Sequence, residues 1–144
     1  MSATKQSAAT NGRRVGLFAT CLVDLFRPGA GFAAVQLLEQ AGYEVNVPEQ
    51  GCCGQPNFNS GDTDGASQMA RRAIESFQEF DYVVVPSCSC AAMIKVHYPD
   101  LFTADSPDRI AADLLAEKTW ELTAFLHEVA GVTELAATLT ADVV

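Results

Sequence analysis

Two adjacent cysteines, Cys52 and Cys53, are followed at once by Gly54 and shortly afterwards by Pro56. Glycine and proline make this stretch unsuitable as the interior of a strand or helix and favour a tight loop. Side chains of neighbouring residues point in opposite directions in extended backbone, so two adjacent thiols gain little as core packing. The motif therefore predicts an exposed loop whose sulfurs are directed at a partner.

The other three cysteines form two further groups, one at Cys21 and one made by Cys88 and Cys90. Thiolates are soft ligands that select zinc, copper(I) or iron–sulfur clusters. Structural zinc sites usually take close pairs such as C-x2-C, and adjacent cysteines are strained as ligands of one small ion. A cluster of several irons is wider and commonly has four cysteine ligands. The pattern favours such a cluster, against the alternative of ordinary buried thiols.

A thiol enzyme is a second interpretation of the same residues. Cys21 follows a strand and precedes a helix, where a helix N-terminus can lower the pKa of a thiol. A phosphatase-like loop would need a glycine-rich cradle ending in arginine, whereas 22–26 is apolar and acidic. A thiol–disulfide enzyme using Cys52, Cys53 and the Cys88/Cys90 pair stays open. So does a zinc or cluster site that only holds the loops together.

Composition narrows the class of protein. The chain has 144 residues, of which 49% are hydrophobic, as expected for one folded domain. A net charge of −9 argues against nucleic acid and anionic membrane surfaces as partners, and no apolar run is long enough for a transmembrane segment. Residues 1–13 are expected to be a flexible lead-in, not a secretory signal. An odd number of cysteines without such a signal predicts the cytoplasm.

Alternating short apolar runs and amphipathic segments predict an α/β fold, with a three-layer, mainly parallel sheet and flanking helices. Helix 106–115 should begin at Ser106–Pro107 and bury Ile110, Ala111, Leu114 and Leu115. Segment 57–65 is predicted to be a loop, and 140–144 the opening of a fourth strand. The predicted strands are 14–20, 43–47 and 81–86, and the predicted helices are 32–41, 64–78, a helix from residue 91, 106–115 and 120–129.

Each cysteine group directly follows a predicted strand. In a parallel sheet these strand ends meet at one carboxyl edge, where open α/β folds place their ligand sites. The three groups are therefore expected to converge, although 30 residues separate Cys21 from Cys52 and 36 separate Cys53 from Cys90.

This spacing, together with segments 20–28, 52–56 and 86–90, resembles the cysteine-rich CCG domain family. Members include the cysteine-rich subunit of heterodisulfide reductase and the iron–sulfur subunit of glycolate oxidase. The amino-acid sequences of these segments are most similar to those of the lactate-utilisation A group, the iron–sulfur subunits of L-lactate dehydrogenase complexes. The resemblance implies an electron-transfer subunit that works with other subunits to oxidise L-lactate, or a related 2-hydroxy acid, to pyruvate.

The resemblance also implies a [4Fe-4S] cluster held by Cys21, Cys52, Cys53 and Cys90, with Cys88 as a further candidate ligand. It implies no catalytic residue in this domain, which carries electrons rather than substrate chemistry, and leaves open whether the chain is itself an enzyme. Because such family members carry two domains in tandem, residues 14–144 are expected to be the first of two copies, in a chain that looks truncated.

Overall fold

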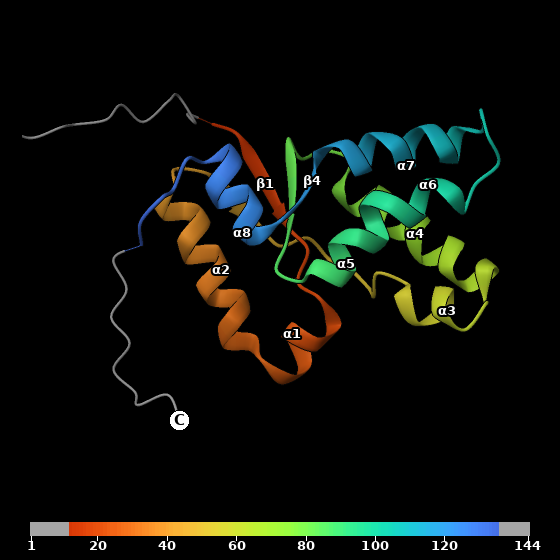
Figure 1. Ribbon diagram of the computed structural model, residues 1–144, viewed down its shortest axis with the longest axis horizontal. Helices are drawn as coiled ribbons and strands as arrows, with labels where there is room; N and C mark the ends of the chain where they lie inside the picture. The colour runs from red at the N-terminus through yellow and green to blue at the C-terminus, as the bar shows by residue number, and fades with distance from the viewer. Residues whose placement is uncertain (1–11, 136–144) are drawn as a thin grey trace, which may run out of the picture.

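Four parallel strands form the centre of the computed structural model, which describes residues 12–135 (Figure 1). The strand order is β2-β1-β3-β4, and Val15 of β1 pairs with Val45 of β2 and with Tyr82 of β3. The strands are β1 (Arg14–Leu17), β2 (Glu44–Asn46), β3 (Tyr82–Val85) and β4 (Thr119–Glu121).

Helices cover both faces of this sheet. The helices α2, α8 and η2 pack on one face, and α4, α5, η1, α6 and α7 pack on the other (Figure 1). The predicted three-layer α/β fold is thus confirmed. The helical segments are α1 (Cys21–Phe26), α2 (Pro28–Gln40), α3 (Gln55–Asn59), α4 (Thr63–Phe77), α5 (Cys88–Ala92), η1 (Met93–His97), α6 (Tyr98–Asp100), α7 (Pro107–Lys118), α8 (Leu122–Ala124) and η2 (Phe125–Val129). Over residues 12–135, none of them is long and apolar enough to cross a membrane.

The core lies on both faces of the sheet because β3 is apolar throughout. Val83 and Val85 join the core cluster under α4, while Val84 joins the cluster under α2. This alternation is the period-two geometry of a strand. On β1, a Cβ added at Gly16 would lie 2.7 Å from the Phe77 ring, so only glycine lets the ring approach so closely.

The ends of several helices follow the expected capping rules. The Ser106 hydroxyl accepts a hydrogen bond from the Arg109 amide at 3.1 Å, which confirms the predicted start of α7. Gly42, with φ of +92°, follows the end of α2, where a left-handed glycine commonly ends a helix.

Three local predictions were wrong. Segment 57–65 is not a loop, because α3 covers its first residues and α4 begins at Thr63. Helix α2 begins at Pro28, four residues before the predicted start at residue 32, since proline is well suited to a first helical position. Trp120 lies in β4, so the fourth described strand precedes the last helix. The strand predicted at 140–144 lies outside the described residues.

The buried stripe of α7 is also different from the prediction. Ile110 and Leu114 are 55% and 60% exposed, whereas Ala112 and Leu115 are buried. The helix is rotated because Leu115 and Ala112 pack into the core cluster under α4.

Glu121 caps the N-terminus of α8. Its carboxylate accepts hydrogen bonds from the amides of Thr123 (2.9 Å) and Ala124 (3.1 Å) and from the Thr123 hydroxyl. Partial burial raises the pKa of this carboxyl, but the hydrogen bonds outweigh burial and lower it. The stabilisation is therefore complete above the ordinary carboxyl pKa and lost as the pH falls through the lowered folded-state pKa.

We expect Glu121→Gln to lower the free energy of unfolding by about 0.5–1 kcal/mol at neutral pH. The difference from the wild type should shrink in acid, as urea denaturation at several pH values would measure. Glu117→Gln, the same change at an exposed position of α7, is the control and should have little effect. An equal loss for Glu121→Gln at every pH would contradict the capping role of the charge.

Candidate metal centre

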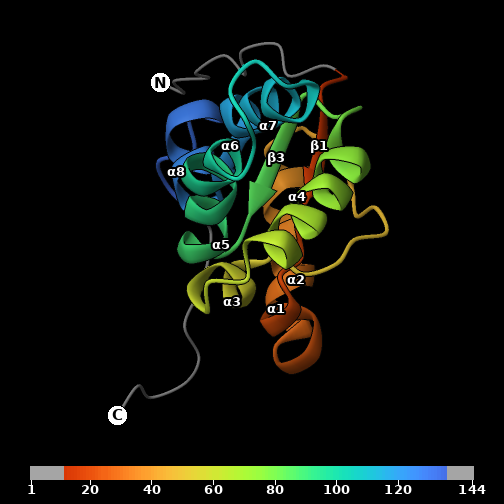
Figure 2. The ribbon, with the colours of Figure 1, turned by 90° about the vertical axis from the view of Figure 1, so that its right-hand side faces the viewer.

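The three cysteine groups lie at the carboxyl edge of the sheet, as predicted. Cys21 is the first residue of α1, directly after β1, and Cys52 and Cys53 lie in the loop between β2 and α3. Cys88 and Cys90 lie in the first turn of α5, after β3. In Figure 2 the arrows of β1 and β3 point toward the end of the molecule where α1, α3 and α5 lie.

Cys53 and Cys90 are in direct contact at this edge. Their sulfur atoms are 3.3 Å apart, with the Cys53 thiol donating to the Cys90 sulfur. Both residues are buried, with exposed fractions of 3% and 8%, and both belong to the core cluster under α4. The contact joins the CCG loop to the start of α5 across 37 positions of sequence.

This contact shifts the pKa values of the two thiols in opposite directions. The hydrogen bond donated by Cys53 lowers the pKa of Cys90 against the opposing effect of burial. The same hydrogen bond, followed by burial, raises the pKa of Cys53. Of the two sulfurs, Cys90 is therefore the one that ionises first and Cys53 is the one that keeps its proton.

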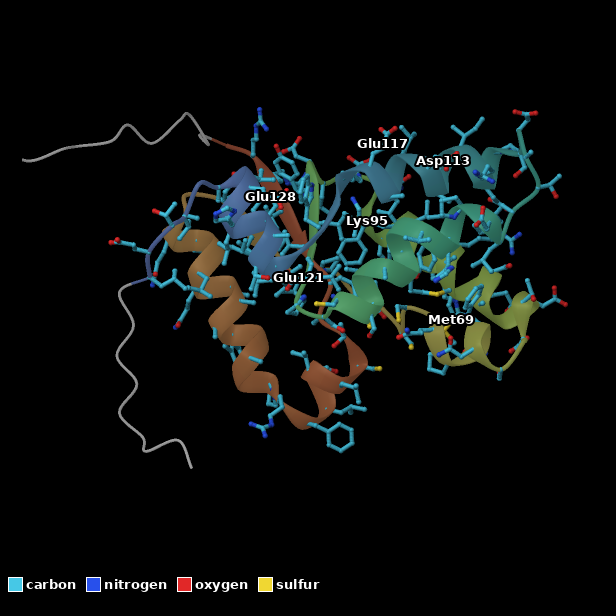
Figure 3. The ribbon with its side chains drawn as sticks, viewed as in Figure 1. Met69, Lys95, Asp113, Glu117, Glu121 and Glu128 are labelled. Carbon is cyan, nitrogen blue, oxygen red and sulfur yellow. The ribbon has the colours of Figure 1, made fainter. Side chains whose placement is uncertain are left out.

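Cys21 and Cys52 are the more exposed members of this group of cysteines. The Cys21 side chain is exposed and Cys52 is half-buried against the core cluster. Burial of the sulfur raises the pKa of Cys21, and so does the neighbouring Cys52 thiol, first of all through its negative charge. The charge of Cys90 acts in the same direction. Cys21, Cys52, Cys53 and Cys90 therefore lie near enough to one another for their charges to interact. Figure 3 shows yellow sulfur atoms in the region between α1, α3 and α5.

Cys88 differs from these four. Its side chain is exposed, and the contacts of the four other thiols do not include it. It lies in a helix that begins at Cys88, whereas helix was expected only from residue 91.

The glycine of the motif fixes the backbone behind Cys53. Gly54 has φ of +83°, a left-handed conformation that favours glycine, and is the N-cap of α3. A Cβ at this position would lie 3.2 Å from the Cβ of Met69 and 3.5 Å from the backbone of Ala66. Pro56 then stands in the first turn of α3, where its missing N–H costs nothing. The sequence Cys-Cys-Gly-Gln-Pro thus turns the chain sharply from the thiols into a helix.

Two serines lie beside Cys90 in the sequence. The nearby hydroxyls of Ser87 and Ser89 lower the pKa of the Cys90 thiol further. These two serines flank Cys88 in the sequence, and their hydroxyls are 3.4 Å apart. Hydroxyl donors to a ligating sulfur are a common way to adjust the potential of a metal centre.

The structure adds two polar residues that sequence reasoning missed. The Tyr98 hydroxyl donates to the Cys53 carbonyl at 2.9 Å. The Gln50 amide donates to the carbonyls of Leu17 and Pro48, both at 3.1 Å, and so ties the CCG loop to the end of β1. Nothing in the local sequence signals these contacts. They run from a side chain to backbone carbonyls, and those of Tyr98 to Cys53 and of Gln50 to Leu17 join segments far apart in the sequence.

The donor set of this site fits a thiolate-ligated centre. Four sulfurs converge from three loops, and sulfur-only ligation suits zinc or an iron–sulfur cluster. Across residues 12–135, no three His, Cys, Asp or Glu side chains are already arranged around a single ion position. The Cys53 and Cys90 sulfurs are also closer together than the roughly 3.8 Å that tetrahedral Zn–S bonds of 2.3 Å would impose. The thiols therefore pack on one another and would have to separate to ligate metal.

Comparisons with known proteins agree with this description. A family model described as a cysteine-rich domain, CCG, matches residues 15–95. "Lactate utilization protein A" of Bacillus subtilis (strain 168) is 50% identical over 127 residues, which cover 88% of this chain and 53% of that protein. The protein of the same name from Macrococcus caseolyticus (strain JCSC5402) is 47% identical over 127 residues, covering 88% of this chain and 51% of the relative.

The chain spans about half the length of the curated relatives it matches. No solved structure matches it. The family model covers more than half of the chain and includes Cys21, Cys52, Cys53 and Cys90. The chain therefore belongs to the cysteine-rich CCG domain family.

Proposed function

We propose that this domain binds a [4Fe-4S] cluster and carries electrons in a complex that oxidises L-lactate, or a related 2-hydroxy acid, to pyruvate. The observation that carries the proposal is the convergence of four free thiols at one edge of the sheet. The names of the relatives supply the link to lactate. Other subunits of that complex would be the partners, and free thiols suit the cytoplasm.

Cys21, Cys52, Cys53 and Cys90 would hold the cluster, which when bound supplies one-electron transfer. The two inner residues, Cys53 and Cys90, shield their side of the site from water because they lie within the core cluster. The exposed Cys21 leaves the opposite side accessible, as electron exchange with a partner requires. Oxidation of a 2-hydroxy acid releases two electrons and two protons, so the domain would pass the electrons on singly.

Anaerobic reconstitution and a reductive titration test this function. A chain loaded with iron and sulfide should take up one electron, with an electron paramagnetic resonance signal that grows in step. The full-length protein with its complex should show the same signal when lactate is added. A loaded chain that accepts no electron at any accessible potential would contradict the electron-transfer role.

The serines beside Cys90 give a quantitative prediction. Ser87→Ala and Ser89→Ala should each lower the midpoint potential of the bound cluster, because a hydroxyl near the Cys90 sulfur would donate to it and stabilise the more negative, reduced form. The expected shift is about 20–60 mV, since one hydrogen bond contributes roughly 0.5–1.5 kcal/mol and 59 mV is tenfold for one electron. Ser60→Ala is the control, because the Ser60 hydroxyl donates to the Asn57 carbonyl. Unchanged midpoint potentials in both variants would contradict a role for these serines in adjusting the potential of the cluster.

A thiol–disulfide function is a second candidate, favoured by the 3.3 Å contact between Cys53 and Cys90. In that reaction the Cys90 thiolate attacks a small disulfide and releases one thiolate, which takes the proton of Cys53. The Cys53 thiolate then displaces the second thiolate and leaves a Cys53–Cys90 disulfide. Treating iron-free protein with oxidised glutathione and mapping the disulfides would test it. Fast, reversible formation of this one disulfide supports the candidate, and slow mixed disulfides at Cys21 and Cys88 would contradict it.

A further inference from the structure

Tyr98 places a polar group in the core beneath the CCG loop. The residue is fully buried, and its hydroxyl donates a 2.9 Å hydrogen bond to the backbone carbonyl of Cys53. The two residues are 45 positions apart in the sequence. A buried hydroxyl is costly unless it is hydrogen-bonded, so this pairing constrains where the loop can lie.

The same helical run carries Tyr98 and Cys90. The segments α5, η1 and α6 follow one another without a gap from Cys88 to Asp100, with Cys90 in the first turn and Tyr98 two turns later. This run therefore holds Cys53 at two points. Its first turn contacts the Cys53 sulfur and its Tyr98 hydroxyl holds the Cys53 carbonyl.

The Tyr98 hydroxyl has one described partner for its proton, the Cys53 carbonyl. Because the side chain is fully buried, no water replaces that partner, and the hydroxyl is satisfied only while the loop stays in place. Packing alone does not require the hydroxyl, because a phenylalanine would fill the same apolar space.

We propose that Tyr98 is a positioning residue that fixes the Cys53 backbone and so sets the separation between the Cys53 and Cys90 sulfurs. Its consequence for a bound cluster rests on the proposed function, whereas its effect on the Cys53 thiol does not. Tyr98→Phe removes the donor and keeps the ring. Tyr43→Phe is the matched control, because Tyr43 is also buried but packs in the core cluster on the opposite face of the sheet.

The first measurement uses reduced, iron-free protein. Each chain is alkylated with iodoacetamide, and mass spectrometry follows the rate at every cysteine. Tyr98→Phe should speed the alkylation of Cys53 by about 3–10-fold, the factor expected for loss of one hydrogen bond. The rates at Cys21 and Cys88, and all rates in Tyr43→Phe, should match the wild type.

The second measurement uses the reconstituted protein. Tyr98→Phe should change the electron paramagnetic resonance spectrum and midpoint potential of the cluster, and Tyr43→Phe should change neither. An unchanged Cys53 alkylation rate in Tyr98→Phe would overturn the positioning role, and so would an equal acceleration at all five cysteines or a variant that fails to fold while Tyr43→Phe folds. If wild-type protein binds no iron, the proposed function fails, and the alkylation rates alone decide the role of Tyr98.

Discussion

Replacing Cys53 by serine is expected to abolish cluster binding, with the iron content falling from about four atoms per chain to near zero. Cys53 lies at the centre of the site, since its sulfur contacts Cys90 and its carbonyl is held by Tyr98. Serine is close in size to cysteine but its oxygen is a hard, weakly acidic donor that iron–sulfur clusters bind poorly. The visible absorption of the reconstituted protein should disappear together with the iron.

Cys88→Ser is the matched control for this substitution. Cys88 is exposed, and within residues 12–135 its side chain makes no hydrogen bond to any of the four converging thiols. Iron content and absorption should therefore equal those of the wild type. Full iron content in Cys53→Ser, or complete loss in Cys88→Ser, would show that the ligand set is assigned wrongly.

Phe77→Ala is expected to lower the free energy of unfolding by about 3–5 kcal/mol. The Phe77 side chain is fully buried, its ring lies 5.3 Å from that of Phe18 and 5.9 Å from that of Phe80, and it packs over Gly16. Alanine would leave a cavity between α4 and β1 that these rings cannot close without moving the strand. Because domains of this size have only about 5–15 kcal/mol of stability, the loss should be evident in urea denaturation.

Phe32→Ala makes the same change at a surface position. Phe32 is 71% exposed, so we expect a change within about 0.5 kcal/mol. Comparable losses for Phe32→Ala and Phe77→Ala would contradict the placement of the core under α4.

The convergence of the cysteine groups was predictable because it depends on topology alone. Three predicted strands end a few residues before Cys21, Cys52 and Cys88, and parallel strands bring such ends together whatever lies between them. The same reasoning could not separate Cys88 from Cys90. That difference depends on which side of the first turn of α5 faces the core, and only packing decides it.

The errors have equally specific causes. The helix α3 contains Asn57 and Asn59, whose composition suggests a loop, but the left-handed backbone of Gly54 starts a helix there. The strand β4 has three residues, too few for period-two alternation to be recognised around Trp120. The hydrogen bond from Tyr98 spans 45 positions and has no local signature. Long-range polar contacts of this kind come from tertiary packing, which a sequence pattern does not contain.

Iron, acid-labile sulfide and zinc analysis of anaerobically reconstituted protein tests the central claim most directly. We expect about four irons and four sulfides per chain, without zinc, because four converging thiolates match the ligand set of a [4Fe-4S] cluster. One zinc per chain with no sulfide, or no metal at all after reconstitution, would contradict it.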